Sequence, residues 1–116
     1  PNAVTIADYA RDVHAWIGAI RQRTGARCAW VLGHSEGALV ALAAAQKPEG
    51  VCGVISVSGS GRPLGDTLRA QLKANPANAP ILDPALKALT ELEAGRRVPA
   101  TSLPGPLVML FAPPVQ

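Results

Sequence analysis

One serine of this sequence lies in a pattern that presents a nucleophile. The pentapeptide Gly33-His34-Ser35-Glu36-Gly37 follows an apolar run and leads directly into an alanine-rich run. A sharp turn from a strand into a helix projects such a serine from the carboxyl end of the strand, where backbone N–H groups can meet developing negative charge. The chemistry expected of Ser35 is therefore nucleophilic attack by its hydroxyl oxygen.

The neighbours of this serine have expected roles of their own. Gly33 and Gly37 are expected to supply room, because the strand and the helix nearly touch at such a turn. The backbone N–H of Glu36 is expected to be one donor to the oxyanion. The alternative is a tight turn in which the side chain of Ser35 only caps the following helix.

A helix is predicted ahead of this turn. Thr5 with Asp8 three residues later indicates a capped helix start, and Gly25 is placed to end the helix. An apolar stripe at helical spacing runs between them from Tyr9 to Ile20. His14 lies beside the stripe, and a lone helical histidine of this kind is typical of a surface or packing residue.

Two apolar runs of strand length enclose the turn and its helix. Residues 28–32 and 51–57 predict strands, and residues 38–46 predict a helix that ends before Pro48. Continuous apolar strands are typical of a parallel sheet that is buried on both faces. The order strand, helix, strand therefore predicts one right-handed βαβ unit.

The second half of the chain has a different character. After a loop at 58–63, helices are predicted from Leu64 to Ala74 and from Asp83-Pro84 to about Gly95. Prolines then recur too densely for a central strand or an ordinary helix. An apolar patch, residues 107–111, lies among them and weakly favours a substrate with an apolar portion.

Composition and charge narrow the class of protein. The chain has 48% hydrophobic and 16% charged residues, which is typical of a globular interior. Its net charge of +3 comes from scattered arginines without interleaved aromatics, which argues against nucleic-acid binding. Cys28 and Cys52 lack the spacing of a metal site and are expected to be buried free thiols, a state that mildly favours a reducing, cytoplasmic setting. No metal, cofactor or membrane span is predicted.

The segment from Ile6 to Val57 resembles the α/β-hydrolase superfamily. Its Gly-His-Ser-Glu-Gly turn followed by Ala-Leu-Val-Ala is similar to the esterase and serine-aminopeptidase-like branch. The resemblance implies an α/β fold class, with residues 1–63 as a partial hydrolase core and residues 64–116 as a helical, proline-rich cap or lid segment. It also implies that Ser35 is the nucleophile and that His34 and the Glu36 side chain support the turn.

The remainder of a catalytic triad is not found in the sequence. The superfamily runs in the order serine, acid, histidine, yet His14 and His34 both precede Ser35. Asp66 is the best local guess for the acid. We therefore expect the chain to be a central piece of a longer hydrolase that needs the rest of that chain to complete its sheet. Alone, the piece is expected to be inactive.

Two other functions remain open at this point. One is a non-catalytic protein of the same fold that binds a ligand or a partner, since a fold does not fix a function. The other is an unrelated βαβ domain that binds phosphate at a helix N-terminus. Residues 59–65 do not support the second, because they fit neither the Gly-x-Gly-x-x-Gly nor the P-loop pattern.

For the serine hydrolase, a small-molecule ester, or failing that an amide, is the expected substrate.

Overall fold

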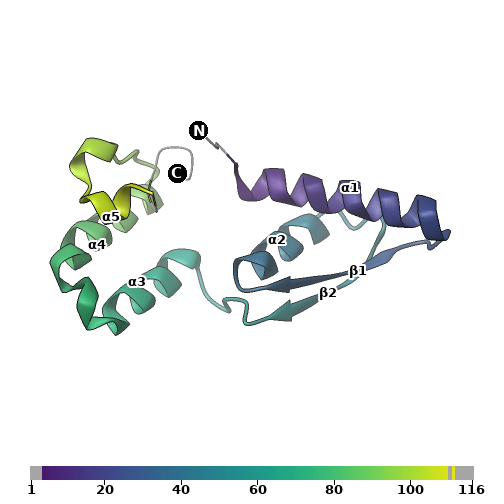
Figure 1. Cartoon of the computed structure of the whole chain (residues 1–116), viewed down its shortest axis with the longest axis horizontal. Helices are drawn as coiled ribbons and strands as arrows, with labels where there is room; N and C mark the ends of the chain where they lie inside the picture. The colour runs from purple at the N-terminus through teal and green to yellow at the C-terminus, as the bar shows by residue number, and fades with distance from the viewer. Residues whose placement is uncertain (1–3, 110, 112–116) are drawn as a thin grey trace. The chain divides into compact units, whose positions relative to one another are not determined.

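The computed structural model describes residues 4–109 and residue 111 (Figure 1). These residues form two compact units, Val4–Gly61 and the residues from Arg62 onward. Five α-helices, two strands and two short 3-10 helices are found in the described part of the chain. Within this part, no helix is both long enough and apolar enough to cross a membrane.

Helix α1 (Ile6–Thr24) opens the first unit and has the predicted caps. The side chain of Thr5 accepts from the Asp8 N–H at 3.2 Å, and the Asp8 carboxylate accepts from the Thr5 N–H at 2.7 Å. Hydrogen bonds from the side chain and the backbone of Thr5 lower the pKa of Asp8. Gly25 ends the helix in the left-handed conformation, with φ of 71°. The predicted helix and both of its ends are confirmed.

Strands β1 (Ala29–His34) and β2 (Val51–Val57) are parallel, and helix α2 (Glu36–Ala45) connects them. The predicted βαβ unit is therefore confirmed, with β1 extending two residues beyond the apolar run. Helix α2 packs on both strands, and α1 packs on α2 (Figure 1). The face of α2 toward these elements is made of Ala38, Ala41 and Ala44, all fully buried. Small side chains let the helix lie close to the sheet.

The second face of the sheet is exposed, which corrects the expectation of burial on both faces. In Figure 1, α1 and α2 lie on the same side of the strands. Alternation along β1 directs Trp30 and Leu32 to the other side, where they are 67% and 62% exposed. Leu32 pairs in register with Ile55 of β2, which is also exposed. The continuous apolar run therefore predicted the strand correctly. It did not predict that one face of the strand is exposed within the unit.

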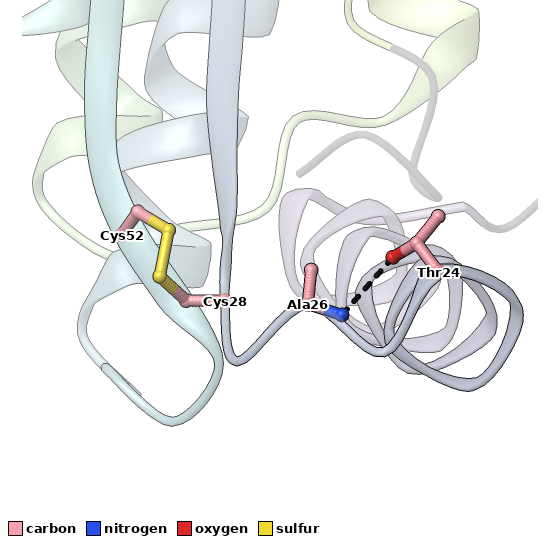
Figure 2. Close-up of a disulfide and its surroundings, with 4 residues drawn as sticks. All are labelled: Thr24, Ala26, Cys28 and Cys52. Carbon is pink, nitrogen blue, oxygen red and sulfur yellow. Dashed lines mark hydrogen bonds between the residues drawn. A yellow bond between two sulfur atoms is a disulfide. The ribbon is translucent and has the colours of Figure 1, made fainter.

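A disulfide joins Cys28 to Cys52, which corrects the expectation of free thiols (Figure 2). Cys28 directly precedes β1, and Cys52 is the second residue of β2. Parallel pairing brings the two strand starts together, with a Cα–Cα distance of 5.1 Å that suits a disulfide. The 24-residue separation gave no sign of this, because only the register makes the two residues neighbours. The two cysteines therefore give no reason to expect a reducing compartment.

The disulfide lies at an irregularity of the strand pairing. Ala29 pairs with Val51, but the next residue, Trp30, pairs with Gly53. Cys52 is thus an extra residue in β2, as in a β-bulge. The Trp30 ring lies over Gly53, where any side chain would collide with it. The covalent bond and the stacked ring together fix the register at the amino ends of the strands.

The second unit consists of helices α3 (Leu64–Ala74), α4 (Ala79–Glu93) and α5 (Gly105–Val108), with 3-10 helices at Pro76–Asn78 and Ala100–Ser102. Helix α3 has its predicted bounds. Helix α4 corrects a prediction, because it starts at Ala79 and contains Pro84 in its interior. Pro84 has no backbone N–H, so the helical hydrogen bond to the Pro80 carbonyl is missing from α4. Tertiary packing compensates, since Ala85, Ala88 and Leu89 just beyond the proline are buried.

Two residues of the apolar patch 107–111 belong to the core of this second unit. Leu107 and Phe111 are 2% and 3% exposed and cluster with residues of α4 and with Val98. Leu110 lies outside the described residues. Met109, by contrast, is 88% exposed, so the core accounts for only part of the patch. Arg69 joins α3 to α4 through two hydrogen bonds to the Glu93 carboxylate, at 2.6 and 2.8 Å.

Candidate active site

Ser35 occupies the turn between β1 and α2 in a strained backbone conformation. Its φ and ψ are 56° and −119°, and positive φ is uncommon for a residue other than glycine. Such strain persists only where the surrounding structure imposes it, and it is concentrated at functional sites. The order of strand, turn and helix expected from the sequence is therefore present at this serine.

The closeness of strand and helix requires glycine at one of the two flanking positions. A Cβ on Gly33 would collide with the carbonyl group of Gly37 and lie 2.7 Å from the Cα of Ala38. A Cβ on Gly37 would meet no atom within 4 Å. Any side chain at position 33 would therefore collide with the start of α2. At Gly37 the backbone makes the close approach, while its Cα faces open space.

The hydrogen bonds of the turn decide against a capping role for the serine side chain. Ser35 is the N-cap residue of α2, but its side chain makes no capping hydrogen bond. Its backbone N–H donates to the Val57 carbonyl at 2.9 Å, and its own carbonyl accepts from the Ala38 N–H at 3.0 Å. Among the described residues, the Glu36 N–H has no acceptor. This donor lies at the N-terminus of α2, where an oxyanion would be stabilised.

A groove of about 410 Å³ runs beside the turn. Helix α1, strand β1 and the start of α2 line it, and the lining includes the neighbours Gly33, His34, Glu36 and Gly37 but not Ser35 itself. Most of the remaining lining is apolar or aromatic, as in Tyr9, Val13, Trp16, Val31 and Val40, and Asp12 adds one carboxylate to that of Glu36. The groove has the composition of a small-molecule site, with a few polar groups among apolar ones.

Neither histidine is arranged as the base for Ser35. The Nε2 atom of His14 lies 2.8 Å from the Ala44 carbonyl oxygen, at the opposite end of α2 from the serine. His14 is therefore a packing residue that joins α1 to α2, as predicted. His34 is the last residue of β1, and alternation directs it to the exposed face of the sheet, away from α2.

Asp66, the residue suggested as the acid of the triad, lies beside an arginine of its own helix. Asp66 lies in the first turn of α3, and its carboxylate is 3.7 Å from the Arg69 guanidinium. Cys28 and Cys52 are joined in the disulfide, so they supply no thiolate. Within the described ranges, no three histidine, cysteine, aspartate or glutamate side chains lie together as a metal site would require.

Sequence reasoning missed a second serine at this edge of the sheet. Ser58 directly follows β2 and has φ of 52°. Register pairs His34 with Val57, so Ser58 follows β2 at the level where Ser35 follows β1. The only signal in the sequence is the Ser58-Gly59 pair directly after a predicted strand, and this pair is equally typical of an ordinary loop.

Comparison with known proteins identifies the fold family. A family model described as the alpha/beta hydrolase fold matches residues 1–91, which is most of the 116-residue chain. The chain therefore belongs to the alpha/beta hydrolase fold family. Searches of curated proteins and of solved structures each found no match. The family indicates a hydrolase-type enzyme, while the branch, the substrate and the roles of individual residues are not given by it.

Proposed function

We propose that the chain carries the nucleophile of a serine hydrolase that acts on carboxylic esters, with amides as a second substrate class. The observation that supports this most is the strained conformation of Ser35 between β1 and α2, without a capping hydrogen bond from its side chain. A serine that neither caps the helix nor relaxes its backbone has a conformation that local folding does not explain. A nucleophile that must project from the turn explains it.

The proposed reaction proceeds through an acyl-enzyme. The Ser35 Oγ attacks the carbonyl carbon while a histidine takes its proton, and the N–H of Glu36 donates to the oxyanion of the tetrahedral intermediate. The intermediate collapses, the alcohol or amine leaves with that proton, and water then releases the acid. Gly33 keeps β1 and α2 close enough for this geometry, and the groove beside Ser35 would hold the substrate.

The base and the orienting acid are proposed to come from polypeptide outside these 116 residues. His14 is engaged with the Ala44 carbonyl, and His34 points to the other face of the sheet. The same outside polypeptide would complete the sheet beyond its two strands and supply a second oxyanion donor. Residues 64–116 are proposed as the cap or lid segment of that enzyme, with the packed helices α3, α4 and α5.

A fluorophosphonate probe tests this proposal directly. In a protein that contains this chain together with its flanking polypeptide, the probe should form an adduct that maps to Ser35. The Ser35→Ala variant should not be labelled, and its ester turnover should fall by more than about 10⁴-fold. Ser102→Ala is the matched control, because Ser102 is exposed in the second unit and, among the described residues, its hydroxyl group bonds only to the Pro99 carbonyl. A folded protein without an adduct on Ser35 would instead support a binding module.

A further inference from the structure

Two serines with positive φ directly follow the two strands of the sheet. Ser35 and Ser58 are the non-glycine residues with positive φ in the described part of the chain, at 56° and 52°. Each follows its strand directly, and the register of His34 with Val57 sets them at the same level. The carboxyl edge of parallel strands is where such sheets place their ligands. Two strained residues side by side at this edge call for a common explanation.

The first link between them is a backbone hydrogen bond. The Val57 carbonyl accepts the Ser35 N–H at 2.9 Å, and the same carbonyl belongs to the peptide bond that precedes Ser58. The orientation of that peptide group therefore decides whether its carbonyl oxygen can accept the hydrogen bond from the Ser35 N–H. The φ angle of Ser58 is the torsion that relates this peptide group to the chain that follows it.

The second link is a close contact made by the next residue. A Cβ on Gly59 would lie 2.5 Å from the Ser56 Oγ and 2.8 Å from the Ala38 Cβ, so the Gly59 backbone is pressed against the first turn of α2. Ala38 is fully buried there. Its backbone also lies against Gly33 on the β1 side. The turn that contains Ser35 is thus held between β1 and the loop after β2.

We propose that Ser58 is a positioning residue for Ser35. Its left-handed conformation turns the chain so that the Val57 carbonyl holds the Ser35 amide while Gly59 packs on Ala38. With an extended or helical φ at Ser58, the chain could not keep both contacts. The role belongs to the backbone of Ser58, because its exposed side chain has no part in either contact. This inference rests on the proposed function of Ser35.

Three substitutions at Ser58 test the role of its backbone. Glycine and asparagine accept positive φ, whereas valine is β-branched and resists it. In the protein used for the fluorophosphonate experiment, Ser58→Gly and Ser58→Asn should keep the rate constant of the covalent step within about 3-fold of wild type. Ser58→Val should lower that rate constant by about 10-fold or more, with probe affinity unchanged.

The split between affinity and rate distinguishes positioning from general destabilisation. A merely structural role would lower the melting temperature of Ser58→Val but leave the covalent rate per folded molecule unchanged, and this result would overturn the proposal. Equal losses for Ser58→Gly and Ser58→Val would also overturn it, because they would assign the role to the hydroxyl group. If Ser58→Val does not fold, Ser58→Ala gives the same comparison with a smaller expected loss.

Amide exchange separates this inference from the proposed function. The Ser35 N–H should be protected from exchange in wild type and Ser58→Gly, and should exchange about 10-fold faster in Ser58→Val because the Val57 carbonyl no longer holds it. This measurement does not depend on activity. If the wild-type protein is not labelled at Ser35, the proposed function fails, and faster exchange in Ser58→Val alone still supports the positioning role. Unchanged exchange in every variant overturns it.

Discussion

The backbone N–H of Ser35 donates to the carbonyl oxygen of Val57, 2.9 Å away. This bond extends the pairing of β1 and β2 one residue beyond the last residue of β1, into the turn itself. The turn is therefore held by the neighbouring strand as well as by its own helix. The bond uses only the backbone of Ser35, whose side chain makes no capping hydrogen bond to the helix.

Gly33 and Gly37 should respond in opposite ways to alanine. Gly33→Ala introduces a methyl group into the backbone of Gly37 and Ala38, and should lower the free energy of unfolding by roughly 1–3 kcal/mol or prevent folding. Gly37→Ala adds a methyl group in open space at the second position of α2, and helix propensity favours it by up to about 1 kcal/mol. Urea unfolding of both variants measures the difference. Equal losses would contradict the close approach at Gly33.

Reduction of the Cys28–Cys52 disulfide should destabilise the first unit. The bond closes a loop of 24-residue separation that contains β1 and α2, and chain entropy predicts a loss of about 3 kcal/mol on opening it. Urea unfolding with and without reductant measures this for the wild type. The double variant Cys28→Ser with Cys52→Ser should unfold like the reduced protein and should not respond to reductant. A wild-type protein insensitive to reductant would argue against the disulfide.

His14 should contribute to stability and not to chemistry. His14→Phe removes the hydrogen bond to the Ala44 carbonyl while keeping a ring between α1 and α2, and should lower the free energy of unfolding by about 1 kcal/mol. The rate of fluorophosphonate labelling at Ser35 should stay the same in a protein that is labelled. Chemical unfolding and labelling measured on one preparation separate the two effects. A large loss of labelling in a stable variant would mark His14 as a base.

The ion pair between Arg69 and Glu93 should make the second unit sensitive to acid. The hydrogen bond from Arg69 lowers the pKa of Glu93 in the folded protein. A carboxyl group whose pKa is lower in the folded protein stabilises the fold at pH values above its pKa in the unfolded chain, which is about 4.3 for glutamate. This stabilisation is lost as the pH falls through the pKa of the folded protein. Melting curves of wild type and Glu93→Gln should differ near pH 7, and the difference should shrink as the pH falls below about 4. A constant difference over that range would argue against the pair.

The 116-residue chain by itself should show no turnover that depends on Ser35. Both of its histidines are directed away from the serine, so nothing in the described structure can take the proton of the hydroxyl group. Hydrolysis of an activated ester by the chain and by its Ser35→Ala variant should be equal within error. Greater hydrolysis by the unsubstituted chain would reveal a base that the structure does not place near Ser35.

The sequence carried enough local information to predict the elements around Ser35. The Thr5–Asp8 capping box, Gly25 and the apolar strand runs act over a few residues, and each was found where it was predicted. The features that were missed depend on contacts between segments. The disulfide requires the register of β1 with β2, and the left-handed Ser58 is defined by what packs around it. Helix α4 shows the same limit, since distant packing outweighs the local signal of Asp83-Pro84.

Both tryptophans of the first unit lie largely in solvent, so their intrinsic fluorescence can report on binding. Trp16 lines the groove beside Ser35 and is 71% exposed, while Trp30 stands on the open face of the sheet at 67%. The sequence has no other tryptophan. Indole emission shifts to shorter wavelengths when water leaves the ring. A ligand in the groove would therefore shift the emission of Trp16 to shorter wavelengths, and a polypeptide on the sheet face would do the same to Trp30. Variants that lack one tryptophan at a time would distinguish the two events.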